Sequence, residues 1–421
     1  MLKELRHQKN YHWTSSSPMK KYGLIFLLVS ITCGCVSTPD SYSTQETMKE
    51  KQVLEDNKLG VDGLGGARVA ELTPDGKHIL VTSGDDNSLA IFNVDSDFEL
   101  SFSRVFKNNS TIDGLEGAVS LAVSSDGRRI YVVSYYDSAV AVFEQDEQGS
   151  YQFIRAIRDG LPYDEIFSDN ESLKTKDKLG LLGAYDIAIT ADNSQLFVAS
   201  VASNAVSIFD INKNGDVVFN HAIRDGDDTK YGLGGAVNVI ITPNDSQVIV
   251  AGFNENSITV FNRTANGVLE YSQTLVNGKD GVKNMIAPQG LAISPDGNYL
   301  YAACGGGNAI AVFARKDEGR YSYIQSISNS DDDVRGLGGA GYVTTSPDGA
   351  RVFVASESDN AVVTLAKQND GTLKILSVVK SEGISKVDER NGAASVYVSP
   401  DGKYLLVTTG KGDTLIVYSL Y

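Results

Sequence analysis

The sequence predicts an all-β fold, a seven-bladed β-propeller with four antiparallel strands in each blade. Two observations carry this prediction. One unit recurs seven times between about Gly63 and the end of the 421-residue chain. Each unit consists of short apolar runs separated by turn residues, and no window has a helical period. A period near fifty residues with four short strands per unit is typical of propeller blades.

The first strand of each unit starts with small residues, often Gly-Ala, and ends in Ser or Thr before a Pro-Asp-Gly-like turn. The acidic or amide residue of that turn marks the repeat. It stands at Asp75, Asp126, Asp192, Asn244, Asp296, Asp348 and Asp401, with spacings of 51, 66, 52, 52, 52 and 53 residues. The glycine that follows in most units allows positive φ, which favours tight hairpins.

The second runs are almost continuously apolar, as in IYVVS (130–134) and VFVAS (352–356). A strand with one wet face alternates polar and apolar residues, so these runs predict strands that are buried on both faces. Radially stacked blades provide that environment. The third runs, such as IAVF (310–313), have the same character, and a turn then leads to an aromatic-rich fourth run.

The last blade lacks a fourth run, because the sequence stops at Tyr421 directly after its third. The segment Lys51–Asp56 resembles the ends of the other fourth runs. We therefore expect an N-terminal strand to close blade seven, which removes an open sheet edge. The propeller domain is predicted to cover residues 48–421.

Residues 1–35 predict a signal segment of the lipoprotein type, with Met19 as a better start than Met1. Two lysines follow Met19, an apolar stretch covers residues 23–32, and Cys33-Gly34-Cys35 ends the segment. The apolar stretch is shorter than the ~20 residues that span a bilayer. An ordinary cleaved signal is the alternative. Residues 36–47 are polar and rich in Ser and Thr, which predicts a flexible tether.

The end of this segment resembles bacterial lipoprotein signals, whose processing leaves a lipidated cysteine. Cys35 is the expected lipidation site because Gly34 precedes it, and Cys33 is the alternative. Val36, not Asp, follows, so the resemblance implies an outer-membrane lipoprotein that faces the periplasm or the surface. The expected partners are the membrane, through the lipid, and an envelope protein, peptide or glycan; we expect a monomer.

The net charge of the chain is −16, and the sequence contains no basic patch. These two features exclude nucleic acid as a partner, because its phosphates would be repelled.

Seven residues are predicted to bind a ligand at the mouth of the central channel. The loops from strand four to the next strand one, and from strand two to strand three, gather on one face of a propeller. Their residues differ between units while the strands stay alike, and binding usually resides on such loops. The predicted ligand-binding residues are Arg68, Tyr136, Asp186, Asn238, Gln289, Tyr342 and Glu357.

The sequence identifies no catalytic residue. Beyond the signal segment the only histidines are His78 and His221, and the strand assignment places both away from the channel mouth. Motifs such as G-x-S-x-G and H-E-x-x-H are absent. Glu71 is unusual, because other units have uncharged residues at its first-strand position. As a buried carboxylate near Arg68 it is either an acid/base group with a shifted pKa or part of a structural ion pair near the channel wall, and the ion pair is the favoured account.

Three features leave alternatives open. The insertion 161–178 is either a lid or an acidic surface loop. The acidic runs 225–228 and 331–333 offer oxygen ligands to a divalent cation, but solvated charge is the favoured account. The segment 210–215 begins like a calcium loop, although His221 stands where such a loop needs Glu. We therefore predict no metal site and no cofactor.

The units GAVSLAVSSDGRRIYVVSYYDSAVAVF (117–143) and APQGLAISPDGNYLYAACGGGNAIAVF (287–313) resemble the seven-bladed lactonase-like propellers. That group includes the YVTN repeat proteins, the propeller-type 6-phosphogluconolactonases and the muconate cyclases. The resemblance covers residues 63–421. It implies that Arg68, Arg335, Arg390 and Glu357 take the places of the family's arginine and glutamate residues at the channel, whereas no histidine maps there.

Two functions remain. The first is an envelope-anchored propeller that serves as a ligand- or protein-binding platform at the channel mouth, which the acidic, exported character favours. The alternative is an exported lactonase-like hydrolase or isomerase, similar to 6-phosphogluconolactonase or muconate cyclase. Whether the protein is an enzyme stays open at this point, and a lactone assay separates the two.

Overall fold

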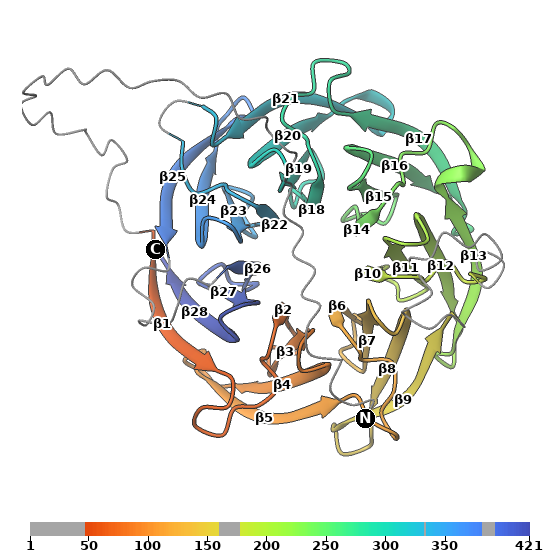
Figure 1. The fold of residues 1–421 in the computed structure, drawn as a ribbon, viewed down its shortest axis with the longest axis vertical. Helices are drawn as coiled ribbons and strands as arrows, with labels where there is room; N and C mark the ends of the chain where they lie inside the picture. Colours follow the sequence, from red (N-terminus) through yellow and green to blue (C-terminus); the bar gives the residue numbers. More distant parts are fainter. Residues whose placement is uncertain (1–46, 160–176, 332–333, 381–391) are drawn as a thin grey trace, which may run out of the picture. The chain divides into compact units, whose positions relative to one another are not determined.

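The computed structural model describes residues 47–159, 177–331, 334–380 and 392–421. Over these residues the chain forms strands β1 to β28 and two short 3-10 helices, η1 and η2. The strands build seven four-stranded sheets around a central axis (Figure 1). The predicted all-β, seven-bladed propeller with four antiparallel strands per blade is confirmed. No helix in the described ranges is long and apolar enough to cross a membrane.

Each blade runs from an inner strand to an outer strand. Blade one contains β2 (Ala67–Leu72), β3 (His78–Ser83), β4 (Ser88–Val94) and β5 (Leu100–Lys107). Blade two contains β6 (Ala118–Val123), β7 (Arg129–Ser134), β8 (Ala139–Gln145) and β9 (Tyr151–Arg158). Blade three contains β10 (Ala184–Ile189), β11 (Gln195–Ser200), β12 (Ala205–Ile211) and β13 (Val217–Arg224), followed by η1 (Asp225–Asp227). Blade four contains β14 (Ala236–Ile241), β15 (Gln247–Gly252), β16 (Ser257–Arg263) and β17 (Leu269–Val276).

Blade five contains β18 (Pro288–Ile293), β19 (Tyr299–Cys304), β20 (Ala309–Arg315), η2 (Asp317–Gly319) and β21 (Tyr321–Ser328). Blade six contains β22 (Ala340–Thr345), β23 (Arg351–Ser356), β24 (Ala361–Lys367) and β25 (Leu373–Lys380). Blade seven contains β26 (Ala393–Val398), β27 (Tyr404–Thr409), β28 (Thr414–Leu420) and β1 (Met48–Glu55).

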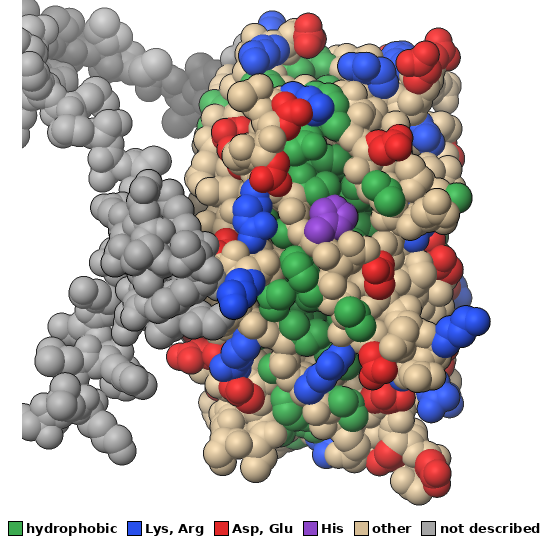
Figure 2. Space-filling view, turned by 90° about the vertical axis from the view of Figure 1, so that its right-hand side faces the viewer, with side chains coloured by type: hydrophobic (Ala, Val, Ile, Leu, Met, Phe, Trp, Pro, Cys, Tyr) green, Lys and Arg blue, Asp and Glu red, His purple; other side chains and the backbone are tan. Residues whose placement is uncertain are grey.

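The two histidines among the described residues lie where the sequence predicts, His78 at the start of β3 and His221 on the outer strand β13. A side view of the ring shows a histidine among mixed apolar and charged side chains (Figure 2).

The turn that marks the repeat is held by a side-chain hydrogen bond. In blade one the Thr73 hydroxyl donates to Asp75 Oδ1 (2.6 Å), which also accepts the Lys77 N–H (3.1 Å). The corresponding Ser or Thr donates to Asp or Asn in the other six blades, at 2.5 to 2.9 Å. Such side-chain bonds imitate a backbone turn, which explains why the motif recurs.

Both faces of each sheet are buried, as the continuous apolar runs predict. One apolar cluster fills each space between neighbouring blades; Leu80, Ile130 and Phe143, for example, pack together between blades one and two. The phenylalanines of the third strands have no exposed surface: Phe92, Phe143, Phe209, Phe261 and Phe313. Burying one such side chain stabilises the fold by roughly 1.5–3 kcal/mol, so the clusters are the main source of stability.

A repeated hydrogen bond joins neighbouring blades at six of the seven seams among the described residues, and we call it the seam hydrogen bond. The last residue of the turn between strands two and three accepts a backbone N–H from the loop that opens the next blade. The pairs are Asn87–Gly117 (2.7 Å), Ser138–Gly183 (3.1 Å), Asn204–Gly235 (2.7 Å), Asn256–Ala287 (2.7 Å), Asn308–Gly339 (2.9 Å) and Asp413–Gly66 (2.7 Å). All six acceptors have φ between 46° and 53°, a region that Asn and Asp tolerate best.

The predicted closure of blade seven is confirmed. Strand β1 pairs antiparallel with β28, so residues from both ends of the propeller share one sheet. The strand begins at Met48, three residues before the predicted start, because the Met48 side chain is buried in the apolar cluster between blades six and seven. It ends at Glu55, one residue before the predicted end.

Gln52 ties the closing strand to blade one. Its Nε2 donates to the Leu100 carbonyl and its Oε1 accepts the Leu100 N–H, both at 2.8 Å. Two other seams have the same reciprocal pair, Gln273 with Tyr321 and Gln325 with Leu373. The N-terminal strand therefore acts as an ordinary fourth strand.

We predict that Gln52→Ala destabilises the whole ring, because it removes two hydrogen bonds at the closing seam. The expected loss is about 1–3 kcal/mol in the free energy of unfolding, measured by denaturant titration. The exposed neighbour Lys49 provides the control, and Lys49→Ala should change this energy by less than about 0.5 kcal/mol. Equal unfolding midpoints for the two variants would contradict the proposed role of β1.

Candidate active site at the ring axis

The inner strands present two layers of side chains to the ring axis. Each blade is packed on both sheet faces, so we infer that a partly exposed side chain on an inner strand reaches the axis or an end of the channel. The second residues of these strands form the upper rung: Arg68, Val119, Tyr185, Val237, Gln289, Gly341 and Ala394. The fifth residues form the lower rung: Glu71, Ala122, Ala188, Ile240, Ala292, Thr344 and Tyr397. Five residues of the upper rung and six of the lower are partly exposed.

Arg68 is the only charged residue of the upper rung. A Cβ atom added to Gly84 would lie 3.6 Å from Arg68 Nε, and one added to Gly410 would lie 3.6 Å from Nη1. The side chain thus lies beside two glycines that leave room for it. Its guanidinium group forms no hydrogen bond or ion pair with any residue that the structure describes, whereas its backbone carbonyl accepts a bond from the Thr408 hydroxyl (2.6 Å). A partly buried, unpaired guanidinium group is suited to bind an anion or a polarised carbonyl.

An aromatic wall covers one side of the axis. The rings of Tyr135 and Tyr185 meet edge to face with centroids 6.1 Å apart, and the Tyr185 side chain also packs in the apolar cluster that Val201 and Phe253 border. Burial raises the pKa of Tyr185; the charge of Arg68 opposes this shift, and that of Glu357 adds to it. The phenol therefore lies within electrostatic reach of both charged groups.

The opposite side of the upper rung is polar and lined with small residues. Gln289 Oε1 lies between Gly305 and Gly341, 2.9 and 3.1 Å from the positions that their Cβ atoms would take. Glu357, in the turn after β23, forms an ion pair with Lys411 across the seam of blades six and seven (3.2 Å). Aromatic and polar walls that face each other suit a small ring with polar substituents.

Asp186 and Asn238 form a buried network instead of facing the axis. Asp186 Oδ1 accepts the Ser120 hydroxyl (2.6 Å), and Oδ2 accepts Asn238 Nδ2 (2.6 Å) and the Val239 N–H (2.9 Å). Asn238 Oδ1 accepts the Leu291 N–H (3.0 Å), so the network links the inner strands of blades two to five. Burial raises the pKa of Asp186 to about 6, against the effect of its hydrogen bonds.

Glu71 is the only charged residue of the lower rung. Burial raises the pKa of its carboxyl group to about 8, and the nearby Asp186 adds to the shift. Glu71 forms no ion pair among the described residues, so the structural ion pair near the channel wall, which the sequence favoured, is not found there. Tyr342 and Tyr397 are close enough for the Glu71 charge to raise their pKa values, although burial is the larger cause for both.

The structure brings together some of the seven predicted ligand-binding residues. Arg68 and Gln289 lie on the upper rung, and Glu357 lies beside it. Tyr342 is partly exposed, while Tyr136 lies farther out, 42% exposed and packed over Gly117. Asp186 and Asn238 are buried with their polar groups paired. That these residues bind a ligand stays a prediction.

The seven predicted residues include Asp186 but not its neighbour Tyr185, which ends the same loop and occupies the place of Arg68 and Gln289 on its strand. Arg335, a candidate from the family resemblance, is exposed and donates to the neighbouring Val334 carbonyl. The candidate Arg390, most of the insertion 161–178 and the lipidation site Cys35 lie outside the described residues.

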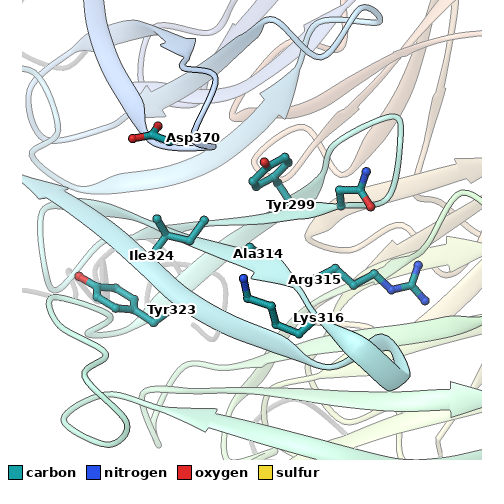
Figure 3. Close-up of a pocket in the computed structure, with 8 residues that line it drawn as sticks. Tyr299, Ala314, Arg315, Lys316, Tyr323, Ile324 and Asp370 are labelled. Atoms are coloured by element: carbon teal, nitrogen blue, oxygen red, sulfur yellow. The ribbon is translucent and has the colours of Figure 1, made fainter.

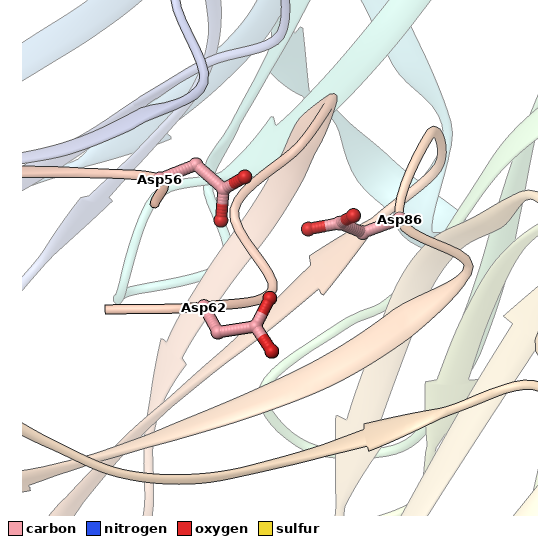
Figure 4. A group of neighbouring side chains, drawn as sticks. All are labelled: Asp56, Asp62 and Asp86. Carbon is pink, nitrogen blue, oxygen red and sulfur yellow. The ribbon is translucent and has the colours of Figure 1, made fainter. Parts of the chain in front are cut away.

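One group of carboxylates has the geometry of a cation site. Asp56, Asp62 and Asp86 have carboxylate oxygens within 4.8 Å of one another, facing a common space (Figure 4). Lys107 already neutralises two of them, at 2.6 Å from Asp62 and 3.2 Å from Asp86. Asp56 and Asp86 also accept backbone N–H groups of the loop before β2. These contacts give the acids a structural role at the closing seam.

A cavity of about 600 Å³ lies away from the axis, along the outer strands of blade five. Its lining includes Tyr299, Arg315, Lys316, Tyr323 and Asp370 (Figure 3). The polar ends of these side chains point in different directions. A binding site needs polar groups that converge on a ligand, and the axis meets this condition better.

Known proteins match this chain from blade one to its end. A family described as lactonase, 7-bladed beta-propeller, matches residues 69–282, 240–337 and 333–421. The 6-phosphogluconolactonase of Enterobacter sp. (strain 638) is 25% identical over 195 residues, and that of Klebsiella pneumoniae (strain 342) is 23% identical over 218 residues. These stretches cover 46% and 51% of this chain. They span 58% and 59% of the relatives, less than two thirds of their length.

Solved structures have the same fold. A candidate 6-phosphogluconolactonase from Bacteroides uniformis aligns with a TM-score of 0.60 and 17% identity, covering 79% of this chain and 87% of that one. A protein from Lactobacillus plantarum aligns with a TM-score of 0.60 and 15% identity, with the same coverage. At such identities the likeness shows the fold alone.

We predict that Asp186→Ala destabilises the propeller by about 3 kcal/mol or more, because it leaves three buried donors without an acceptor. Urea titration measures this loss. Asp97→Ala, at an exposed turn, is the control and should have an effect below about 0.5 kcal/mol. If both variants unfold at the wild-type urea concentration, the network does not hold the inner strands.

Proposed function

Because the chain belongs to the family of seven-bladed lactonase β-propellers, we propose that it hydrolyses a lactone at the ring axis. The observation that carries the proposal is the unpaired Arg68 guanidinium group, which faces an aromatic wall across the upper rung. The proposed substrates are lactones derived from sugars, since the two curated relatives are 6-phosphogluconolactonases.

Lactone hydrolysis needs stabilisation of the negative charge that forms on the carbonyl oxygen when water adds. Arg68 supplies a positive charge and N–H donors, and the Tyr185 hydroxyl forms no hydrogen bond with a described residue, so it is available as a second donor. Such donors act strongly in a partly buried site, where water screens them less. The aromatic wall provides a surface for the apolar face of the ring.

Glu357 is the proposed acceptor for the proton of the attacking water. It lies beside the upper rung, where it forms an ion pair with Lys411, and a carboxylate at this place can accept a proton from water bound on the axis. The binding-platform function has no observation of its own in its favour, and it is what remains if no lactone is turned over.

We predict that the purified propeller hydrolyses at least one lactone of a panel of γ- and δ-sugar lactones, followed by acid release. Arg68→Gln should lower kcat/KM about 10²–10³-fold, the usual effect of losing one oxyanion donor. Arg128→Gln removes an exposed arginine and should leave the rate unchanged. Absence of turnover by the wild-type protein, or equal rates for the two variants, would contradict the lactonase function.

We also propose that the protein is an outer-membrane lipoprotein, held by a lipid on Cys35 at the end of the polar segment 36–47. The supporting features are the basic start at Met19, the short apolar stretch and the Gly34-Cys35 pair. An anchored lactonase would act on lactones outside the cytoplasm.

Anchoring predicts that Cys35→Ser abolishes metabolic labelling with a radioactive fatty acid and moves the protein out of the membrane fraction. Stable attachment needs about two acyl chains, which a lipidated N-terminal cysteine supplies. Cys33→Ser is the matched control and should retain labelling. Wild-type protein that carries no fatty acid would contradict the anchor while leaving the lactonase function intact.

A further inference from the structure

Glu71 is the feature of the axis that the proposed function leaves unexplained. The other residues of its rung are three alanines, an isoleucine, a threonine and a tyrosine, so it carries the only carboxyl group at that level. The side chain is partly exposed, although its blade is packed on both faces. Its carboxyl group forms no hydrogen bond or ion pair with any residue that the structure describes.

The surroundings of Glu71 favour the protonated form of the acid. The ionisable side chains on the inner strands around it are Arg68, Tyr185, Asp186, Tyr342 and Tyr397. Arg68 does not pair with it. Both oxygens of Asp186 are occupied by hydrogen bonds, so this group contributes only repulsion. Burial, the main cause, and Asp186 together raise the pKa of Glu71 to about 8, which leaves most of the carboxyl groups protonated near neutral pH.

A purely structural role does not account for this residue. A partly buried carboxyl group without a partner reduces stability, and Ala122, Ala188 and Ala292 on the same rung have no side-chain group that could bond to it. Unfavourable groups of this kind concentrate at functional sites.

Resting on the proposed lactonase function, we propose that Glu71 is a catalytic acid that donates its proton to the ring oxygen of a lactone held by Arg68. The two residues lie three positions apart on β2, which spans at most about 10 Å at ~3.3 Å per residue and less here, because β2 has a register shift between Ala67 and Ala70. One sugar-sized ring and two side chains can bridge that spacing.

The step balances without any further reactant. Water adds to the carbonyl carbon, and its proton passes to Glu357. The bond between that carbon and the ring oxygen then breaks, its electron pair goes to the ring oxygen, and the Glu71 proton converts this oxygen into a hydroxyl group. The product is an open-chain hydroxy acid. Glu357 then releases its proton to the solvent and Glu71 takes one up, so both groups return to their starting state.

The test compares two lactones in the wild-type protein and in Glu71→Gln. The leaving group of δ-valerolactone is an alkoxide, which needs a proton, whereas that of dihydrocoumarin is a phenoxide, which leaves without one. We expect Glu71→Gln to lower kcat by about 10²-fold or more on δ-valerolactone and by less than about tenfold on dihydrocoumarin. Glu147→Gln, at an exposed turn, is the control and should match the wild type on both.

The pH profile gives a second readout. The protonated acid is the active form, so wild-type kcat/KM on δ-valerolactone, which reports the free protein, should fall as the pH rises through about 8, the pKa of Glu71. Glu71→Gln should lack this fall. Infrared difference spectra at about pH 6.5 should also show a protonated carboxyl band that Glu71→Gln removes, independent of any substrate.

The outcomes separate the two proposals. Turnover with equal losses on both lactones, or a Glu71 carboxylate signal at that pH, overturns the role of Glu71 and leaves the lactonase function standing. No turnover of any lactone by the wild-type protein overturns the lactonase function and this step with it.

Discussion

A ring of seven sheets holds its shape only if every seam between blades holds, and the seam hydrogen bond is the contact that repeats around it. A residue with positive φ, usually Asn, accepts a backbone N–H of the next blade at 2.7 to 3.1 Å. At the six seams where the described residues form it, this bond fixes the opening loop of the next blade and therefore the start of its inner strand. The closing seam uses Asp413 in the same way, supported by the Gln52 contacts of β1.

Because the seams and apolar clusters repeat, the positions that face the axis are free to differ. The upper rung is aromatic at blade three and polar or small at blades five to seven. The only charged side chains of the two rungs, Arg68 and Glu71, both come from β2. The scaffold is thus nearly symmetric while the site is not, and this asymmetry is what gives the axis a defined chemistry.

The fold could be predicted from the sequence almost completely. The turn motifs and continuous apolar runs repeat about every fifty residues, and the missing fourth strand of the last unit stands out against that repeat. The site could be predicted only in part. Every inner strand has a register shift near its start, for example between Ala184 and Asp186. Such a bulge breaks the alternation of side chains, so the sequence alone does not tell that Tyr185 faces the axis while Asp186 enters a buried network.

The central claim is that a lactone binds on the axis between Arg68 and Glu71, and a crystal structure with a slowly hydrolysed analogue tests it most directly. A δ-lactam of a sugar acid keeps the ring and the carbonyl group but resists hydrolysis. The account predicts density on the axis, with the lactam carbonyl at hydrogen-bonding distance from the Arg68 guanidinium group and the ring beside Tyr185. Density only in the cavity near Tyr299 on blade five, or none on the axis at saturating analogue, would contradict it.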